Sequence, residues 1–235
     1  MKTIGLLGGM SWESTVSYYR IINNEIKARL GGYHSAKCLL YSVDFAEIEA
    51  CQRANDWDRT AEILGQAAQS LEQGGAEFLV LCTNTMHNVI DQISQHITMP
   101  VLHIADATAA RVRQTGLSKV GLLGTKYTME QDFYKSRLIE QGLGVIIPGA
   151  ADREIVHNII FDQLCLGSIQ DDSRREYLRI IADLVSRGAE GIIMGCTEIG
   201  LLVGPDHTQI PLFDTAAIHA LQAVDYALSG DSLHR

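Results

Sequence analysis

The sequence predicts an α/β protein of two similar lobes, each a four-stranded, mainly parallel sheet flanked by helices. Short apolar runs alternate with longer helical patterns along the chain, which is typical of parallel sheets covered by helices. Several segments of the first half also recur, in the same order, in the second half. We therefore expect two lobes related by internal duplication.

The first lobe can be laid out in chain order. The apolar run 3–7 predicts a strand, and the glycines after it predict a tight turn into a helix that starts at Ser11, a favourable N-cap residue. Three more strands are expected over 38–42, 78–81 and 100–103; the third is apolar on both faces, which suits a central position. Helices are expected up to Gly31 and over 47–53, 56–73, 86–93 and 105–113.

The second lobe repeats this order. Segment 119–124 resembles 3–8, segment 192–195 resembles 79–82, and segment 211–213 resembles 100–102, with shifts of 116, 113 and 111 residues. Between them we expect a strand over 144–147 and helices over 129–141, 152–166 and 171–187. We expect the final helix, 215–228, to pack on the first copy. The predicted lobes are 1–104 plus 211–235, and 105–210.

Composition excludes several classes of protein. The net charge is −9, and no basic block is present that would follow a phosphate backbone, which argues against nucleic-acid binding. The start of the chain lacks the pattern of a signal peptide, and no apolar run approaches the about 18 to 20 residues of a membrane-spanning helix. These features predict a cytoplasmic protein without membrane contact.

The cysteines and glycines exclude further kinds of site. The five cysteines are odd in number and lack the spacing of a zinc site, so we predict neither a disulfide framework nor a metal centre. The turn at Gly8–Gly9 lacks the GxGxxG spacing of a dinucleotide site.

Two short polar stretches close equivalent strands: Thr83-Asn84-Thr85, and Gly195-Cys196-Thr197-Glu198. The shift of 113 residues places Thr83 on Cys196. Ligands of parallel α/β sheets bind beyond the carboxyl ends of the strands, so we expect one cleft with Thr83 on one wall and Cys196 on the other.

Neighbouring residues complete this predicted cleft. Asn84, Thr85 and Thr197 are expected to cap helices and contact a substrate carboxylate, because free N–H groups at helix starts bind anions. Thr125 occupies the turn equivalent to Gly9–Met10 and is a candidate substrate contact, as is Glu198.

The chemistry follows from two groups that face one carbon. A helix N-terminus lowers a thiol pKa from about 8.5, so we expect a reactive thiolate at Cys196. Two acid/base groups on opposite faces can remove a proton from one side and return one on the other. That is racemisation without a cofactor.

The chain resembles the aspartate/glutamate racemase family of cofactor-independent enzymes over essentially its whole length. The resemblance is carried by three segments: Gly8-Gly9-Met10-Ser11-Trp12-Glu13-Ser14-Thr15, Thr83-Asn84-Thr85-Met86-His87, and Gly195-Cys196-Thr197-Glu198. It implies two lobes with the active site between them, two cysteine bases, no pyridoxal phosphate, no metal, and a homodimer. It also implies that Met10 and Gln52 line the substrate pocket.

One departure from the family pattern concerns the first of the two cysteine bases. Most members have a cysteine where this chain has Thr83, whereas Cys82 lies one residue earlier and should point away from the cleft. The pair of Thr83 and Cys196 resembles an L-aspartate/glutamate-specific subgroup. That resemblance implies that Cys196 takes the proton of the L substrate and that Thr83, a much weaker acid, serves the other face.

A second departure concerns specificity. Aspartate racemases of the family often carry a lysine where this chain has Cys165, and a basic residue near Gln52 and Arg53. The sequence thus predicts a racemase of acidic amino acids that favours the L substrate, with broader specificity left open. The alternatives are a single-cysteine decarboxylase, a cis-trans isomerase of the same scaffold, or a non-catalytic amino-acid-binding protein.

Overall fold

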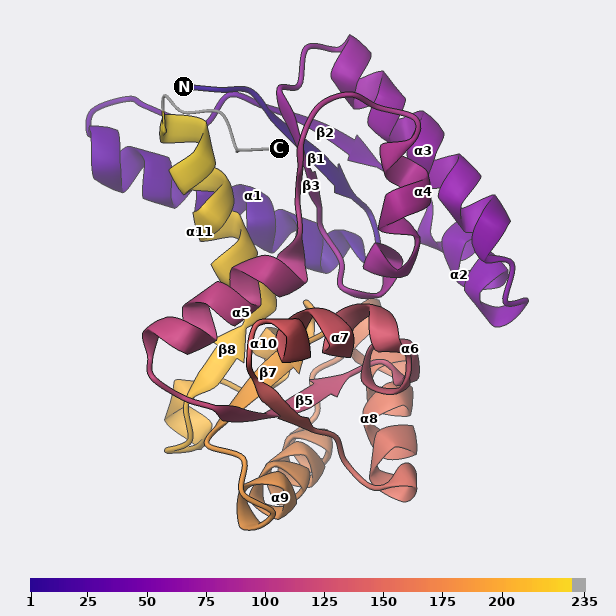
Figure 1. The fold of residues 1–235 in the computed structure, drawn as a ribbon, viewed down its shortest axis with the longest axis vertical. Coiled ribbons are helices and arrows are strands. Elements are labelled where there is room, and N and C mark those ends of the chain that lie inside the picture. The colour runs from indigo at the N-terminus through magenta and orange to yellow at the C-terminus, as the bar shows by residue number, and fades with distance from the viewer. Residues whose placement is uncertain (230–235) are drawn as a thin grey trace. The chain divides into compact units, whose positions relative to one another are not determined.

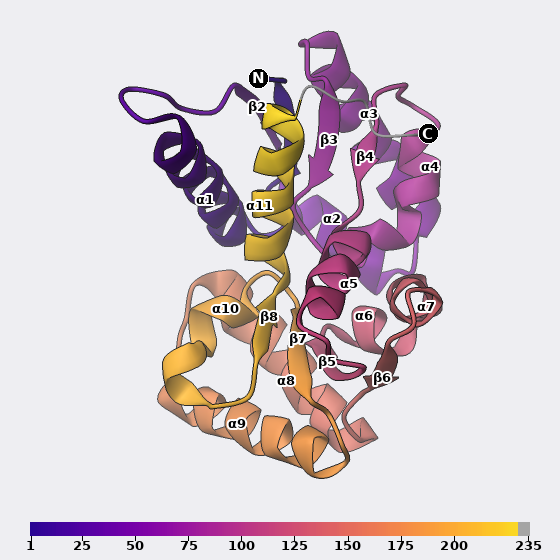
Figure 2. The same cartoon turned by 60° about the vertical axis from the view of Figure 1, so that its left-hand side comes forward.

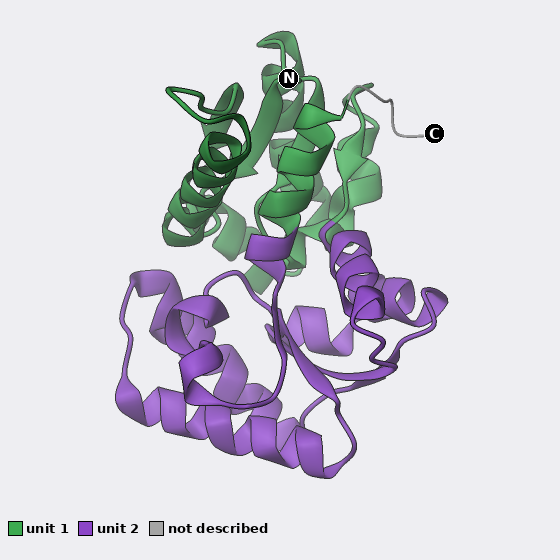
Figure 3. Ribbon diagram, turned by 90° about the vertical axis from the view of Figure 1, so that its left-hand side faces the viewer, with its two compact units in different colours: residues 1–103, 219–235 green, residues 104–218 purple. Residues whose placement is uncertain are grey.

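The computed structural model describes residues 1–229, which form two compact units (Figure 3). Unit 1 contains residues 1–103 and the chain from His219 onward, and unit 2 contains residues 104–218. Each unit holds one four-stranded sheet in which every strand pairing is parallel. The predicted fold class is confirmed.

Unit 1 has the strand order β2-β1-β3-β4. Its elements are β1 (Ile4–Gly8), α1 (Trp12–Leu30), β2 (Cys38–Ser42), α2 (Phe45–Arg53), α3 (Trp57–Gln73), β3 (Phe78–Leu81), the 3-10 helix η1 (Thr85–Val89), α4 (Ile90–Ser94), β4 (Val101–Leu102) and most of α11 (Thr215–Leu228).

Unit 2 has the order β6-β5-β7-β8. Its elements are α5 (Ile104–Gln114), β5 (Lys119–Gly124), α6 (Lys126–Glu130), α7 (Asp132–Glu140), β6 (Gly144–Ile146), α8 (Ala150–Asp162), η2 (Leu164–Leu166), α9 (Asp171–Ser186), β7 (Gly191–Gly195), α10 (Ile199–Leu202), η3 (Pro205–His207) and β8 (Leu212–Asp214).

Helices cover both faces of the first sheet because its central strands are apolar on both sides. Leu7 and Leu81 point to a core shared with α2, α3 and α4. On the other face, Phe78 meets Tyr226 of α11 edge to face at 4.7 Å, and α1 lies beside α11 (Figures 1 and 2). The expectation that the final helix packs on the first copy is confirmed.

The second sheet is covered in the same way. Leu123 and Met194 pack against α8 and α9, whereas Leu122 and Ile193 pack against α5 and α7 on the opposite face. Side chains of alternate residues thus enter two separate cores. In the described residues, no helix is long and apolar enough to cross a membrane.

Strand register supports the internal duplication residue by residue. Leu6 pairs with Val80 in unit 1, and their counterparts Leu122 and Ile193 pair in unit 2. The edge strands follow the same rule, since Val80 pairs with Leu102 and Ile193 with Phe213. Thus the two units share both strand order and register.

The return of the chain to unit 1 lies later than we expected. The predicted boundary assigned residues from 211 onward to the first lobe, but unit 2 extends to Ile218. The reason is β8, which pairs with β7 through Ile193 and Phe213 and so completes the second sheet.

Candidate active site

The first group of candidate residues lies at the carboxyl ends of β1 and β3, which meet because Leu7 and Leu81 pair in parallel. After β1, Gly9 turns with a positive φ of 95°, and its N–H donates to Thr15 Oγ1 at 2.9 Å. A Cβ on Gly8 would lie 2.4 Å from the Thr15 methyl group. The close approach of this turn to α1 therefore requires glycine.

Thr83 follows β3 and is 7% exposed. Its position is set by the backbone, because the N–H of Cys82 donates to Leu7 O at 2.9 Å and that of Thr83 donates to Leu81 O at 2.9 Å. Asn84 and Thr85 follow at the start of η1. The expected capping role of Asn84 is wrong, since its side chain makes no capping hydrogen bond there.

Cys82 is a core residue, as its position inside the strand predicts. It is completely buried, its sulfur lies 3.6 Å from Val80 O, and burial raises the pKa of its thiol far above the usual value. A neutral, buried thiol of this kind is a poor base.

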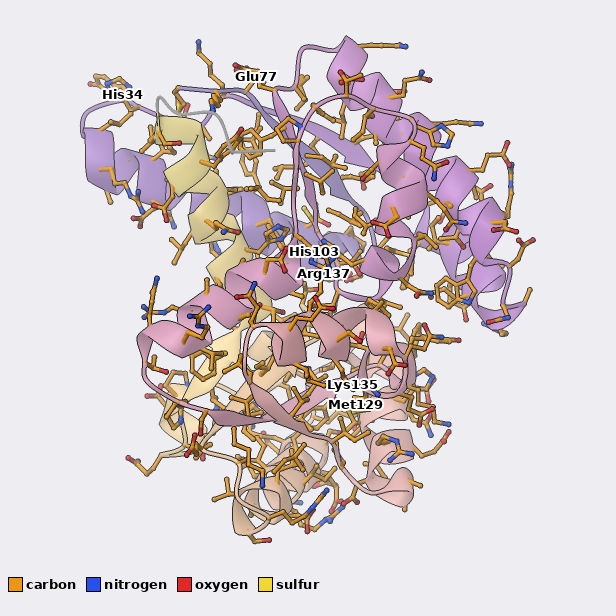
Figure 4. The ribbon with its side chains drawn as sticks, viewed as in Figure 1. His34, Glu77, His103, Met129, Lys135 and Arg137 are labelled. Atoms are coloured by element: carbon orange, nitrogen blue, oxygen red, sulfur yellow. The ribbon has the colours of Figure 1, made fainter. Side chains whose placement is uncertain are left out.

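The His87 side chain contacts the backbone of Thr83. Its Nδ1 is 2.8 Å from Thr83 O, and because a carbonyl only accepts, Nδ1 must carry a proton and donate it. The His87 ring packs edge to face against His103 with centroids 4.4 Å apart; His103 is labelled in Figure 4. A buried imidazole thus donates a hydrogen bond to the backbone of Thr83.

A second buried imidazole ties three elements of unit 1 together. His219 Nε2 lies 2.9 Å from Leu102 O, so it donates there, and Nδ1 accepts from the Tyr18 hydroxyl at 3.0 Å. Burial lowers the pKa of His219 to about 4, so the ring is neutral at pH 7.

The two remaining pocket candidates of unit 1 are also buried. Met10 and Gln52 are each 4% exposed, and Gln52 lies in the last turn of α2. Its neighbour Arg53 instead extends into solvent and pairs with Glu49. Of these two candidates for the specificity position, only Gln52 is buried.

The second group of candidates lies at the carboxyl ends of β5 and β7. Thr125 caps α6 with its hydroxyl, which accepts from Thr128 N at 3.3 Å. A Cβ on Gly124 would lie 2.8 Å from Gly195 O, so glycine allows the two strand ends to approach. Thr125 is thus the N-cap residue of α6.

Cys196 and Glu198 form a close pair after β7. The Cys196 thiol donates to Glu198 Oε2 at 2.9 Å, and the Thr197 hydroxyl donates to the same oxygen at 2.9 Å. Cys196 is 9% exposed and Glu198 is 1% exposed. A carboxylate, a thiol and a hydroxyl therefore share one buried position.

The expected thiolate at Cys196 is wrong for this structure. Burial raises the pKa of the thiol well above its ordinary value, and the negative charge of Glu198 raises it further. A backbone hydrogen bond from Glu198 acts in the opposite direction but is the smaller effect. Cys196 is consequently a protonated thiol at neutral pH.

Thr83 and Cys196 occupy equivalent positions in their own units. Leu81 pairs with Leu7 in the first sheet, and Met194 pairs with Leu123 in the second. Thr83 lies two residues beyond Leu81, as Cys196 does beyond Met194. The equivalence predicted from the repeats is thus present in the strand register.

Comparison with known proteins identifies the family. A sequence model described as Asp/Glu/hydantoin racemase matches residues 7–223. The chain belongs to this family. It is an amino-acid racemase, in agreement with the racemases among its relatives.

Three relatives show the extent of the similarity. A crystal structure of a Yersinia pestis protein, provisionally assigned as an Asp/Glu racemase, is 56% identical, with a TM-score of 0.89, and covers 97% of this chain and 100% of that one. An aspartate racemase homologue from Pyrococcus horikoshii OT3 is 35% identical, with a TM-score of 0.82 and the same coverage. The broad specificity amino-acid racemase RacX of Bacillus subtilis is 23% identical over 239 residues, which is 97% of this chain and 100% of RacX.

In this racemase the residue at the expected lysine position, Cys165, lies in η2. It is close enough to Cys196 to contribute to the raised pKa of that thiol. Lys126 pairs with Glu154, and Arg153 pairs with Glu130. The groups that act on Cys196 among the described residues include no cation.

Two contacts of unit 1 could not be predicted from the sequence. The contact of His87 with Thr83 depends on the tight turn of η1, and the bond of His219 to Tyr18 joins residues 201 positions apart. The Cys196–Glu198 contact has a sequence signal, the adjacent Cys-Thr-Glu, but its geometry depends on the turn before α10.

Proposed function

We propose that this racemase interconverts the L- and D-enantiomers of the acidic amino acids glutamate and aspartate, and that it favours the L substrate. The observation that carries the proposal is the equivalence of Thr83 and Cys196 at the ends of β3 and β7 in two units of the same topology. One chain thereby supplies two acid/base groups of different strength.

In the proposed reaction, Cys196 takes the Cα proton of the L-amino acid. The threonine hydroxyl of Thr83 then donates a proton to the opposite face of the resulting carbanion, and water returns a proton to the threonine oxygen. Met10, Gln52, Asn84, Thr85, Thr125 and Thr197 are proposed as substrate contacts. We also propose a homodimer, as the family resemblance implies.

Exchange of the Cα proton in deuterated water tests this function. The protein is incubated with L-glutamate and, separately, with D-glutamate, and the loss of the Cα signal is followed by proton NMR. We expect exchange from both enantiomers with a faster initial rate from the L form, because a thiol is a far stronger acid than a threonine hydroxyl. Equal initial rates would remove the proposed asymmetry.

Two cysteine variants assign the exchange to one residue. Cys196→Ala should abolish it in a folded protein, whereas Cys82→Ala should retain it, because Cys82 is a core thiol. Loss of exchange in Cys82→Ala alone would instead make Cys82 the base. Binding of glutamate without exchange would identify an amino-acid-binding protein, and a product with fewer carbons would identify a decarboxylase.

A further inference from the structure

The proposed reaction requires Cys196 to accept a proton, yet its sulfur already carries one. The thiol donates that proton toward Glu198 Oε2 over 2.9 Å. A protonated sulfur cannot take the Cα proton of a substrate until its own proton has moved. A proton acceptor must therefore lie within hydrogen-bond reach of the sulfur.

Glu198 has the position of such an acceptor. Its Oε2 accepts from Cys196 and from the Thr197 hydroxyl, which fixes the oxygen beside the sulfur. The backbone on both sides is anchored: Ile199 N–H donates to Cys196 O at 3.1 Å, and Leu201 N–H donates to Glu198 O at 2.9 Å. With 1% of Glu198 exposed, water competes little for this carboxylate.

Among the described residues, Cys165 of η2 and Tyr177 of α9 also interact with the Cys196 thiol, and neither is a carboxylate. Tyr177 is completely buried, its hydroxyl donates to Val156 O at 3.2 Å, and burial raises its pKa well above the ordinary value. A neutral phenol that already donates its proton to a carbonyl is a poor acceptor.

We propose that Glu198 is a catalytic residue that takes the thiol proton of Cys196, rather than a contact of the substrate. This rests on the proposed racemase reaction. The S–H bond of Cys196 breaks as an O–H bond forms on Glu198 Oε2, leaving a thiolate and a neutral carboxylic acid. The thiolate then takes the substrate Cα proton, and Glu198 releases its proton to water, which restores the thiol and the carboxylate.

The variant Glu198→Gln tests this role because it keeps the shape and removes the ability to accept a proton. Its matched control is Glu190→Gln, which removes the same charge just before β7, at the opposite end of that strand. Two quantities are measured: the rate at which iodoacetamide alkylates Cys196, read by mass spectrometry, and the kcat and KM of racemisation.

The two quantities should change in opposite directions. Removing the negative neighbour lowers the pKa of the thiol, so alkylation at pH 8 should become about 10-fold faster. Racemisation should nevertheless lose about 100-fold in kcat, a typical value for loss of general acid/base catalysis, with little change in KM. Glu190→Gln should match the wild type in both measurements. If Glu198→Gln does not fold, Glu198→Asp, which keeps a carboxylate, should retain part of the kcat.

Three results would overturn the proposal. Faster alkylation together with faster racemisation would mean that Glu198 only suppresses the thiolate. Unchanged alkylation would mean that the carboxylate does not act on the sulfur. A raised KM with unchanged kcat would make Glu198 a substrate contact. A wild-type protein that exchanges no Cα proton would instead refute the proposed function, and alkylation, which needs no turnover, would still decide whether Glu198 controls the sulfur.

Discussion

Single side chains account for the different chemistry of the two strand ends. Cys196 has a carboxylate 2.9 Å from its sulfur, which keeps a proton in place and provides an acceptor for it. At Thr83, the His87 imidazole instead donates a hydrogen bond to the backbone carbonyl oxygen. The first arrangement suits proton transfer at sulfur, and the second suits a firmly positioned hydroxyl.

His87 should therefore act as a positioning residue for Thr83. His87→Ala leaves the Thr83 carbonyl without this donor, which costs about 1 to 3 kcal/mol of unfolding free energy. We expect kcat for Cα exchange to fall about 10-fold, an order-of-magnitude estimate for a displaced reactive group. His87→Asn, whose amide nitrogen can take the place of Nδ1, should restore most of the kcat.

The control for this prediction is His34→Ala, since His34 is an exposed histidine of the same unit (Figure 4). It should leave both stability and exchange at wild-type values. Equal kcat in His87→Ala and His87→Asn would show that the donor at Nδ1 does not position Thr83.

Strands were more predictable than the helices beside the site. The run 38–42 predicts β2 to the residue, because a short strand is a local sequence pattern. The helix expected over 86–93 is instead divided into η1 and α4, with Val89 at φ −113° between them. That break and the histidine contacts behind Thr83 depend on tertiary packing, which a periodicity pattern does not contain.

The buried His219, which links α11 to Tyr18 of α1 and Leu102 of β4, should make the stability of unit 1 sensitive to acid. His219 has a folded pKa of about 4 and an unfolded value of about 6.5. Between these values only the unfolded chain binds the proton, so stability present above pH 6.5 is lost as the pH falls toward 4. At about 1.36 kcal/mol per pH unit, the loss is on the order of 3 kcal/mol.

The variant His219→Gln isolates this effect, because its amide nitrogen can still donate to Leu102 O but does not titrate in this range. Hydrogen exchange of α11 peptides at pH 7.5, 6 and 5 should show a steep loss of protection in the wild type and a shallower one in the variant. His34→Gln is the exposed control. Parallel profiles for the wild type and His219→Gln would contradict the assignment.

The two units have the same strand register, but the residues that follow their central strands differ in acidity. Leu6–Val80 and Leu122–Ile193 remain equivalent pairs, and the residues beyond the central strands are Thr83 in one copy and Cys196 in the other. The shared register follows from apolar cores that tolerate little slippage. The proposed acid/base positions lie past the strands, where a substitution changes acidity without changing the sheet.

Thr83→Cys should therefore make the two copies chemically alike. A thiol with a pKa of about 8.5 is a far better acid and base than a hydroxyl, and the side chains are similar in size, so the fold should persist. In deuterated water, the initial Cα exchange rate from D-glutamate should rise about 10-fold and approach that from L-glutamate. Thr83→Val, which keeps the shape and removes the hydroxyl, should slow racemisation in both directions. Wild-type rates in Thr83→Val would reduce Thr83 to a structural residue, and the second proton would then have to come from another group or from water.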